Sequence, residues 1–112
     1  MAQQQKVAVI TGAAGGLGAA FAKALAADGF AVAVVDIKDG ADTVAAIEGA
    51  GGTARSFACD MTDPAAVEAL GAAVTAQLGT ASVLVNNAGR YGNCAFADMT
   101  YEISPQLFVT VG

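Results

Sequence analysis

The sequence contains no histidine and only two cysteines, Cys59 and Cys94. Their spacing is not that of a metal-binding pair, and no histidine could complete a zinc site, so we expect no metal centre. Two cysteines also make no disulfide framework, which fits a reducing compartment. Cys59 lies in an apolar-rich stretch, and we expect its thiol to be buried.

Basic residues are scarce as well: five lysines and arginines stand against ten aspartates and glutamates, giving a formal net charge of −5. So few cations cannot neutralise a row of phosphates, and we expect no nucleic-acid partner. No apolar run is long enough to span a membrane, and the start, MAQQQK, lacks a signal-peptide pattern. We therefore expect a cytoplasmic protein with no membrane partner.

What the sequence does contain is apolar: 55% of its 112 residues are hydrophobic, which favours a folded domain. Short apolar runs, typical of buried strands, alternate with helical patterns. The expected strands are Val7–Ile10, Ala31–Val35, Thr53–Cys59 and Ser82–Val85. Strands that alternate with helices need crossover connections and form a parallel sheet. The pattern predicts an α/β fold, a Rossmann-type doubly wound parallel sheet of about four strands, in one domain of residues 1–112.

The first expected helix follows a glycine-rich turn. Leu17, Phe21 and Leu25 fall four residues apart and therefore share one face of this helix. Gly29 is expected to end it as a left-handed cap.

Two more helices are expected further along the chain. One covers Asp39–Ala50, with Val44 and Ile47 pointing inward. Asp63 and Pro64 predict the N-cap and first position of the other. Its apolar stripe consists of Val67, Leu70, Val74 and Leu78.

The glycine-rich turn reads TGAAGGLG over residues 11–18, with the spacing GxxxGxG. Gly12 permits a sharp exit from the strand, and Gly16 removes a side chain where the backbone must approach a pyrophosphate. Gly18 lets the helix pack closely on the sheet, and free N–H groups at the helix start face the anion. Glycines can also simply fill turns in a Gly- and Ala-rich chain. The position between a strand and a helix favours a dinucleotide site.

Asp36 stands at the end of the second strand, 18 residues after Gly18. A carboxylate there can accept hydrogen bonds from both ribose hydroxyls of the adenosine half and repel a 2′-phosphate. No basic residue stands at Gly15 or Ile37, and Lys38 is expected to be solvated. The sequence therefore predicts NAD in preference to NADP, although an aspartate here could also merely begin a loop.

Two further motifs come after the later strands: Asp60-Met61 after the third, and Asn-Asn-Ala-Gly over residues 86–89 after the fourth. Together with residues 11–18, they make residues 6–100 resemble the N-terminal half of the short-chain dehydrogenase/reductase family, of the classical type. The resemblance implies an NAD(P)-dependent oxidoreductase, acting by hydride transfer on a small secondary alcohol or ketone, and a homotetramer at full length. The cofactor-binding residues that it implies are Gly12, Gly15, Gly16, Leu17, Gly18, Asp36, Asp60, Met61, Asn87, Ala88 and Gly89.

The resemblance implies distinct roles within this set. The glycine turn would hold the pyrophosphate, and Asp36 would select NAD. Asp60 would bond the adenine amino group, with the Met61 backbone beside it. Residues 87–89 would line the cofactor from the adenosine ribose toward the nicotinamide. A turn held by side-chain bonds to the backbone would also account for the paired asparagines at 86 and 87.

The catalytic residues of the family are absent. A tyrosine and a lysine four residues later share one helix face in the family, and the ammonium lowers the pKa of the phenol. Here Ala95 and Pro105 stand four residues after Tyr91 and Tyr101, and no lysine comes after Lys38. We therefore assign no catalytic residue in this chain.

The tail departs from the family too. Thr110 or Val111 stands where the family has an asparagine, and Ser104-Pro105 would interrupt a helix begun at Thr100. Ending after four strands would leave the last one as an open edge. We therefore expect the N-terminal portion of a longer enzyme, incomplete at its C-terminus.

Two other functions stay open. The chain could be a catalytically inactive, truncated dinucleotide-binding module, since it lacks the Tyr-x-x-x-Lys pair. A methyltransferase or flavoprotein Rossmann domain would account for the glycine turn and Asp36 but not for residues 86–89. Tyr91, Asn93 and Cys94 are candidates for the mouth of a substrate pocket or for a solvated loop.

Overall fold

The computed structural model describes residues 5–86 and 107–110. One parallel sheet of five strands has the order β3-β2-β1-β4-β5. The elements in chain order are β1 (Val7–Thr11), α1 (Gly16–Ala27), β2 (Ala31–Asp36), α2 (Ala41–Gly49), β3 (Thr53–Ala58), α3 (Pro64–Gln77), β4 (Ala81–Asn86) and β5 (Leu107–Thr110). The predicted α/β fold of Rossmann type is confirmed.

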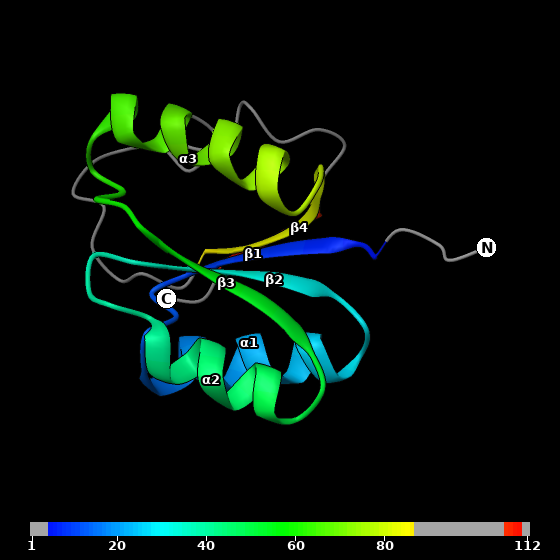
Figure 1. Cartoon of the computed structure of the whole chain (residues 1–112). Coiled ribbons are helices and arrows are strands. Elements are labelled where there is room, and N and C mark those ends of the chain that lie inside the picture. Colours follow the sequence, from blue (N-terminus) through cyan, green and yellow to red (C-terminus); the bar gives the residue numbers. More distant parts are fainter. Residues whose placement is uncertain (1–4, 87–106, 111–112) are drawn as a thin grey trace.

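Helices cover both faces of the sheet: α1 and α2 lie on one face and α3 on the other (Figure 1). Every residue of β1 is buried, as are the first five of β2. Successive side chains of a strand point to opposite faces. Val7 and Val9 therefore belong to the core beneath α3, and Ala8 and Ile10 to the core above α1 and α2. Burial on both faces explains why these strands are continuous apolar runs.

The helix ends match the predicted signals. Gly29 has φ 100° after the end of α1, and the N–H groups of Gly29 and Phe30 donate to the carbonyls of Ala26 and Leu25 at 3.0 and 3.1 Å. These two hydrogen bonds form a Schellman motif, which favours glycine at the left-handed position. At the start of α3, the Asp63 carboxylate is the N-cap.

The stripe predicted for α3 is confirmed at three of its four positions, while Leu78 is partly buried and is the C-cap of the helix. For α1, the predicted shared face is not the one that holds the buried residues. Val67, Leu70 and Val74 are the buried residues of α3. In α1, however, Leu17 is 54% exposed, and Phe21 and Leu25 are only partly buried. The buried residues of α1 are Gly18, Ala19, Ala22 and Ala26. A spacing of four residues shows that side chains share a helix face, but not that this face lies against the sheet. Here the small side chains do, and they let α1 pack closely.

The expectation that β4 would be an open edge is wrong. Residues 107–110 form β5 and pair with β4 in parallel, from Val83 opposite Leu107 to Asn86 opposite Thr110. This short run is rich in the aromatic and β-branched residues that favour strands. Thr100 and Ser104-Pro105, considered above as the start and the interruption of a helix, lie outside the described residues.

The other boundaries shift slightly. The third strand ends at Ala58 instead of Cys59, and the second helix covers Ala41–Gly49 within the predicted Asp39–Ala50. Ile47 is buried as predicted, while Val44 is partly buried. Among the described residues, no helix has the length and apolar character needed to cross a membrane.

Candidate functional site

The carboxyl ends of the parallel strands meet at one edge of the sheet. Thr11, the last residue of β1, lies between Val35 of β2 and Asn86 of β4. Asp36 ends β2, and its carbonyl accepts a hydrogen bond at 3.1 Å from the Cys59 N–H, just after β3. In doubly wound sheets, ligands bind outside these carboxyl ends. The fold thus places the glycine turn, Asp36 and the segment after β3 together.

The glycine turn has the backbone that only glycine adopts readily. Gly12 has φ 66° and Gly16 has φ 59°, both in the left-handed region. Gly15 is extended, and a Cβ built on it would meet no heavy atom within 4 Å. Gly18 is buried in α1, as its expected close packing requires. Gly16 thus has two reasons to be glycine. Its left-handed backbone favours glycine, and a ligand is expected to approach it closely.

Within residues 5–86 and 107–110, no side chain caps the N-terminus of α1. Its N-cap, Gly15, makes no side-chain bond, and no acidic residue lies in the first turn. By contrast, the Asp63 side chain caps α3, and α2 has Asp42 in its first turn. Of the three described helices, α1 alone has neither feature. Its first amide groups and the positive end of its dipole can therefore accept an anion.

Hydrogen bonds from β2 and α2 hold the turn that precedes α1. The Ala13 N–H donates to the Val35 carbonyl at 3.1 Å, and the Ala14 N–H donates to Asp36 Oδ2 at 3.0 Å. The Thr43 hydroxyl, from α2, donates to the Ala13 carbonyl at 2.8 Å. The backbone is thus fixed from both β2 and α2.

Sequence reasoning missed Thr43. It is 3% exposed, and it precedes Ile47 by one helical turn on the inward face of α2. A hydroxyl residue on an otherwise apolar inward stripe was the available signal, because a buried hydroxyl needs a hydrogen-bond partner. The sequence could not name that partner, which lies 30 positions away.

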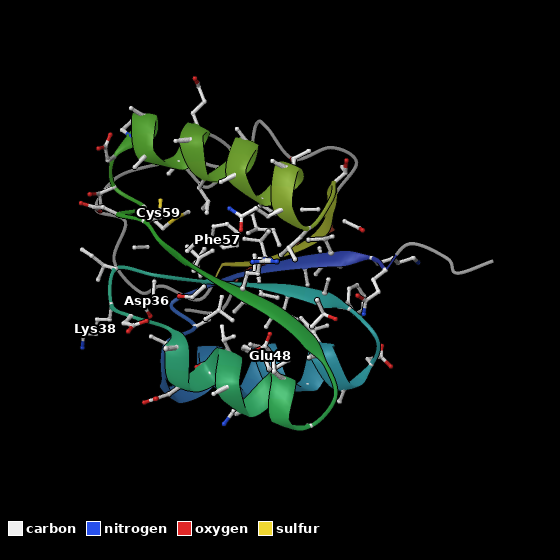
Figure 2. All side chains as sticks on the ribbon, in the orientation of Figure 1. Asp36, Lys38, Glu48, Phe57 and Cys59 are labelled. Atoms are coloured by element: carbon white, nitrogen blue, oxygen red, sulfur yellow. The ribbon has the colours of Figure 1, made fainter. Side chains whose placement is uncertain are left out.

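Asp36 is half-buried, and the backbone fixes its carboxylate. Besides the bond from Ala14 to Oδ2, the Lys38 N–H donates to Oδ1 at 3.0 Å. A carboxylate offers about four acceptor sites, so each oxygen can still accept from a ligand. Figure 2 shows Asp36 at the end of β2, at the same edge of the sheet as Cys59. Lys38 is exposed, as predicted.

The segment after β3 presents Asp60 to solvent. Asp60 Oδ1 accepts hydrogen bonds from the Thr62 hydroxyl at 2.6 Å and the Thr62 N–H at 2.9 Å. These two bonds lower the pKa of Asp60 below its ordinary value of 3.8. Both fall on one oxygen, so Oδ2 remains accessible to a ligand. The neighbouring Met61 packs its side chain against the core beneath α3, so only its backbone could lie beside a ligand.

Cys59 is buried as expected, with 7% of its surface exposed. Burial, together with the negative charges of Asp60 and Asp63, raises the pKa of the thiol. The thiol is therefore protonated at neutral pH. No group of histidines, cysteines and acids in the described part of the chain could hold a metal ion.

Two open clefts adjoin the glycine turn. One, of about 380 Å³, is lined by Ala14, Gly15, Asp36, Lys38 and Asp39. The other, of about 490 Å³, lies between α1 and α2 and shares Ala14 and Gly15 with the first. Leu17 and Ile37 are the exposed large hydrophobic residues of the described part, at 54% and 69%. Leu17 lies in the first turn of α1, and Ile37 directly follows Asp36.

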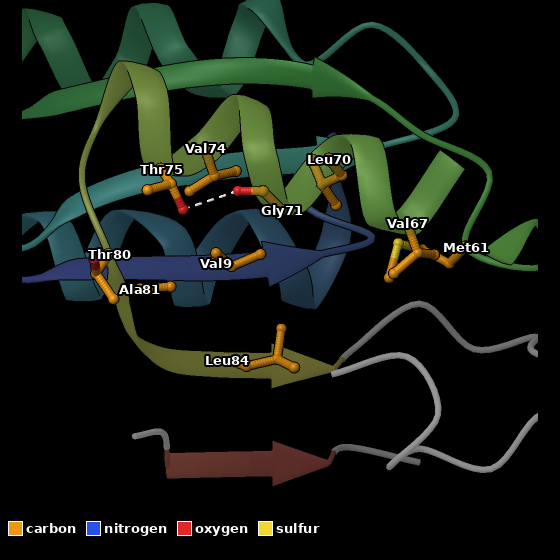
Figure 3. A pocket seen from close by; sticks show the side chains of 10 residues that line it. All are labelled: Val9, Met61, Val67, Leu70, Gly71, Val74, Thr75, Thr80, Ala81 and Leu84. Carbon is orange, nitrogen blue, oxygen red and sulfur yellow. Dashed lines mark hydrogen bonds between the residues drawn. The ribbon is translucent and has the colours of Figure 1, made fainter. Parts of the chain in front are cut away.

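A third space, between α3 and strands β1 and β4, has only about 30 Å³ and an apolar lining that includes Val9, Leu70 and Leu84 (Figure 3). That volume would hold about one water molecule, so this space is a packing gap. The clefts at the turn are the candidate site. The predicted site residues Asn87, Ala88 and Gly89, and the pocket candidates Tyr91, Asn93 and Cys94, lie outside the described residues.

Comparison with known proteins finds relatives among the dehydrogenases. A family model described as short chain dehydrogenase matches residues 6–110. D-threitol dehydrogenase of Mycolicibacterium smegmatis is 49% identical over 86 residues, which are 75% of this chain and 33% of that protein.

Solved structures agree. A metagenomic short-chain oxidoreductase in complex with NADP has a TM-score of 0.73 and 39% identity, over 78% of this chain and 40% of its own. A short chain dehydrogenase/reductase from Burkholderia phymatum in complex with NAD has a TM-score of 0.72 and 39% identity, over 77% and 31%. The chain therefore spans well under half the length of these relatives.

Proposed function

Because this chain belongs to the short-chain dehydrogenase family, we propose that it forms the dinucleotide-binding part of an NAD-dependent oxidoreductase. The observation that carries the proposal is the N-terminus of α1, which has neither a cap nor an acidic residue and lies beside the fixed carboxylate of Asp36. An anion site next to a hydroxyl acceptor matches the pyrophosphate and ribose of such a cofactor.

The turn fits a pyrophosphate. Gly15 leaves open space where a Cβ would point, and Gly16 begins the helix directly beside it. The amide groups of Gly16, Leu17 and Gly18 are the first of α1, and they would donate to the phosphate oxygens. Gly12 shapes the strand exit that brings the backbone to this position.

Asp36 would bind the adenosine ribose and favour NAD over NADP. Its two oxygens are held by Ala14 and Lys38, so the carboxylate needs no reorganisation to accept two hydroxyl groups. Asp39 lines the same cleft and adds to the negative charge that opposes a 2′-phosphate, and Lys38, which also lines it, offsets part of this charge. Related structures hold either NAD or NADP, so the preference proposed here depends on these residues of the chain itself.

The remaining predicted residues complete the proposal. Asp60 would accept from the adenine amino group through its accessible oxygen, with the Met61 backbone adjacent. Ile37, exposed after Asp36, offers an apolar surface for the base. Asn87, Ala88 and Gly89 would line the path toward the nicotinamide.

A bound nicotinamide supplies the hydride acceptor or donor, and the residues of this chain would bind and orient it. We propose a small secondary alcohol or ketone as the substrate. The proton-transferring residues are not assigned within this chain. The homotetramer implied by the family resemblance and the cytoplasmic location expected from the sequence stay predictions.

The test is Asp36→Ala, titrated with NADH and NADPH by fluorescence. Loss of the Ala14 anchor should weaken both cofactors, but NADH also loses its ribose bonds while NADPH is relieved of charge repulsion. We expect NADH affinity to fall about 10- to 100-fold, and NADPH affinity by a few-fold at most.

The matched control is Asp39→Ala, which removes one negative charge from the same cleft but leaves the Ala14 bond intact. We expect it to change NADH affinity less than threefold, because exposed charges interact weakly. Equal losses of NADH and NADPH affinity in Asp36→Ala would contradict the ribose role. An unaltered protein that binds neither cofactor would contradict the proposed function itself.

A further inference from the structure

We propose that Thr43 is a positioning residue of the dinucleotide site, setting the glycine turn through the Ala13 carbonyl. The inference rests on the proposed function, because it concerns the same turn. Thr43 itself belongs to α2 and is 3% exposed, and its hydroxyl donates to Ala13 at 2.8 Å. Only Thr11 is a comparably buried polar residue in the described part of the chain.

The bond acts on one particular peptide group. The Ala13 carbonyl and the Ala14 N–H belong to the same planar unit. Thr43 binds the carbonyl end of this unit, and Asp36 binds its N–H end at 3.0 Å. The plane is therefore held from α2 on one side and from β2 on the other.

This peptide plane controls the path of the chain into α1. Gly15 is the next residue after the unit, and α1 begins at Gly16. The orientation of the plane at 13–14 thus sets the direction in which the first amides of α1 point. The same plane carries the bond that fixes Asp36 Oδ2. Thr43 therefore orients both the anion-binding amides and the ribose carboxylate.

Close packing of Gly40 against the sheet holds the start of α2, and with it Thr43, near the glycine turn. A Cβ on Gly40 would lie 2.7 Å from Val34 Cγ1, so only glycine lets the chain approach β2 this closely. The Gly40 N–H also donates to Ser56 Oγ of β3 at 3.2 Å. Thr43 lies within the first turn of the helix, next to the cleft between α1 and α2.

The experiment uses the 112-residue chain with Thr43→Val, which keeps the shape but removes the hydroxyl. Ala13 would be left with a buried carbonyl lacking its donor, and we expect NADH affinity to fall about tenfold. Thr43→Ser keeps the hydroxyl and should bind within about twofold of the unaltered chain. If Thr43→Val does not fold, Thr43→Ala replaces it.

The matched control is Thr75→Val. The Thr75 hydroxyl also donates to a backbone carbonyl, that of Gly71 at 2.9 Å, but it lies exposed on α3 and away from the turn (Figure 3). We expect its NADH affinity to stay within about twofold, because no contact with the turn is lost. An equal loss of affinity in Thr75→Val would overturn the proposal, as would a loss in Thr43→Ser as large as that in Thr43→Val.

A second measurement separates this inference from the proposed function. Amide hydrogen exchange of Ala14, followed by NMR without cofactor, reports the order of the peptide plane directly. We expect exchange about tenfold faster in Thr43→Val and unchanged in Thr43→Ser. Unchanged protection, or faster exchange with unchanged NADH affinity, would overturn the positioning role. If the unaltered chain binds no NADH, the proposed function fails, and faster exchange would still establish the clamp on the turn.

Discussion

Helices α1 and α3 begin at the same edge of the sheet and cover its opposite faces (Figure 1), yet their first turns are built differently. At α3, Asp63 accepts from the N–H groups of Ala65 and Ala66 at 3.1 and 3.5 Å, and Pro64 has no N–H to satisfy. At α1, the N-cap is Gly15, without a side chain. At α3, the chain itself supplies the hydrogen-bond acceptor for the first amides of the helix. At the start of α1 no side chain caps the helix, so its first amides can bind an external anion.

The largest effect on NADH binding is expected when α1 is given an acidic N-cap like that of α3. Gly15→Asp is compatible with the extended backbone, and its Cβ would meet no neighbour. The carboxylate would bind the amides proposed for the pyrophosphate and repel the ligand. We expect NADH affinity to fall about 100-fold, since close like charges cost several kcal/mol at a protein surface. The melting temperature should stay equal or rise slightly.

Gly15→Asn is the control, since it can cap the helix without the charge. Its loss of NADH affinity should be clearly smaller than that of Gly15→Asp. If Gly15→Asp binds NADH as well as the unaltered chain does, the first turn of α1 is not the phosphate site.

The reverse change removes the cap from α3. Asp63→Ala should destabilise the chain by about 1 kcal/mol in urea denaturation, because two amides lose their acceptor. NADH affinity should change less than twofold. Asp28→Ala, at the exposed C-cap of α1, provides the control and should cost no stability. If Asp63→Ala weakened NADH binding by more free energy than it cost in stability, the N-terminus of α3 would also take part in binding NADH.

The smallest expected effect concerns the turn that leads into α3. Thr62→Val removes the side-chain bond to Asp60, so the pKa of Asp60 should rise part of the way toward 3.8. Because the folded pKa is lowered, the stability that Asp60 contributes is present above that ordinary value and is lost as the pH falls through the folded value. The variant should lose part of this pH dependence. Carboxyl ¹³C NMR titration measures the pKa, and an unchanged value would contradict the assigned cause.

Much of this architecture could be predicted because its signals are local. The runs at 7–10 and 31–35 are apolar without interruption, since both faces of these strands are covered. Asp63-Pro64 and Gly29 mark helix ends by their own conformational preferences. The glycine turn and Asp36 were recognisable for the same reason: each lies directly at the end of a predictable strand.

What could not be predicted depends on contacts between distant parts of the chain. The spacing of Leu17, Phe21 and Leu25 is helical, but only packing against the sheet decides that Ala22 and Ala26 point inward instead. The bond from Thr43 to Ala13 joins two elements whose relative placement the sequence does not state.

The strand at 107–110 was obscured too. The family resemblance implies a helix begun at Thr100, although Ser104-Pro105 would interrupt it, and strand pairing with β4 depends on tertiary contacts that local propensity does not report.

The position of β1 at the centre of the sheet has a consequence for biosynthesis. Its edge beside β4 pairs Val7 with Ala81, so it stays unpaired until the chain has been made to that point. At typical translation rates this interval lasts about 4 to 15 seconds. Throughout it, a strand that is wholly buried in the finished fold has one free edge, and such edges pair readily with other chains. The strand that supports the glycine turn is therefore open to mispairing while the chain is being synthesised.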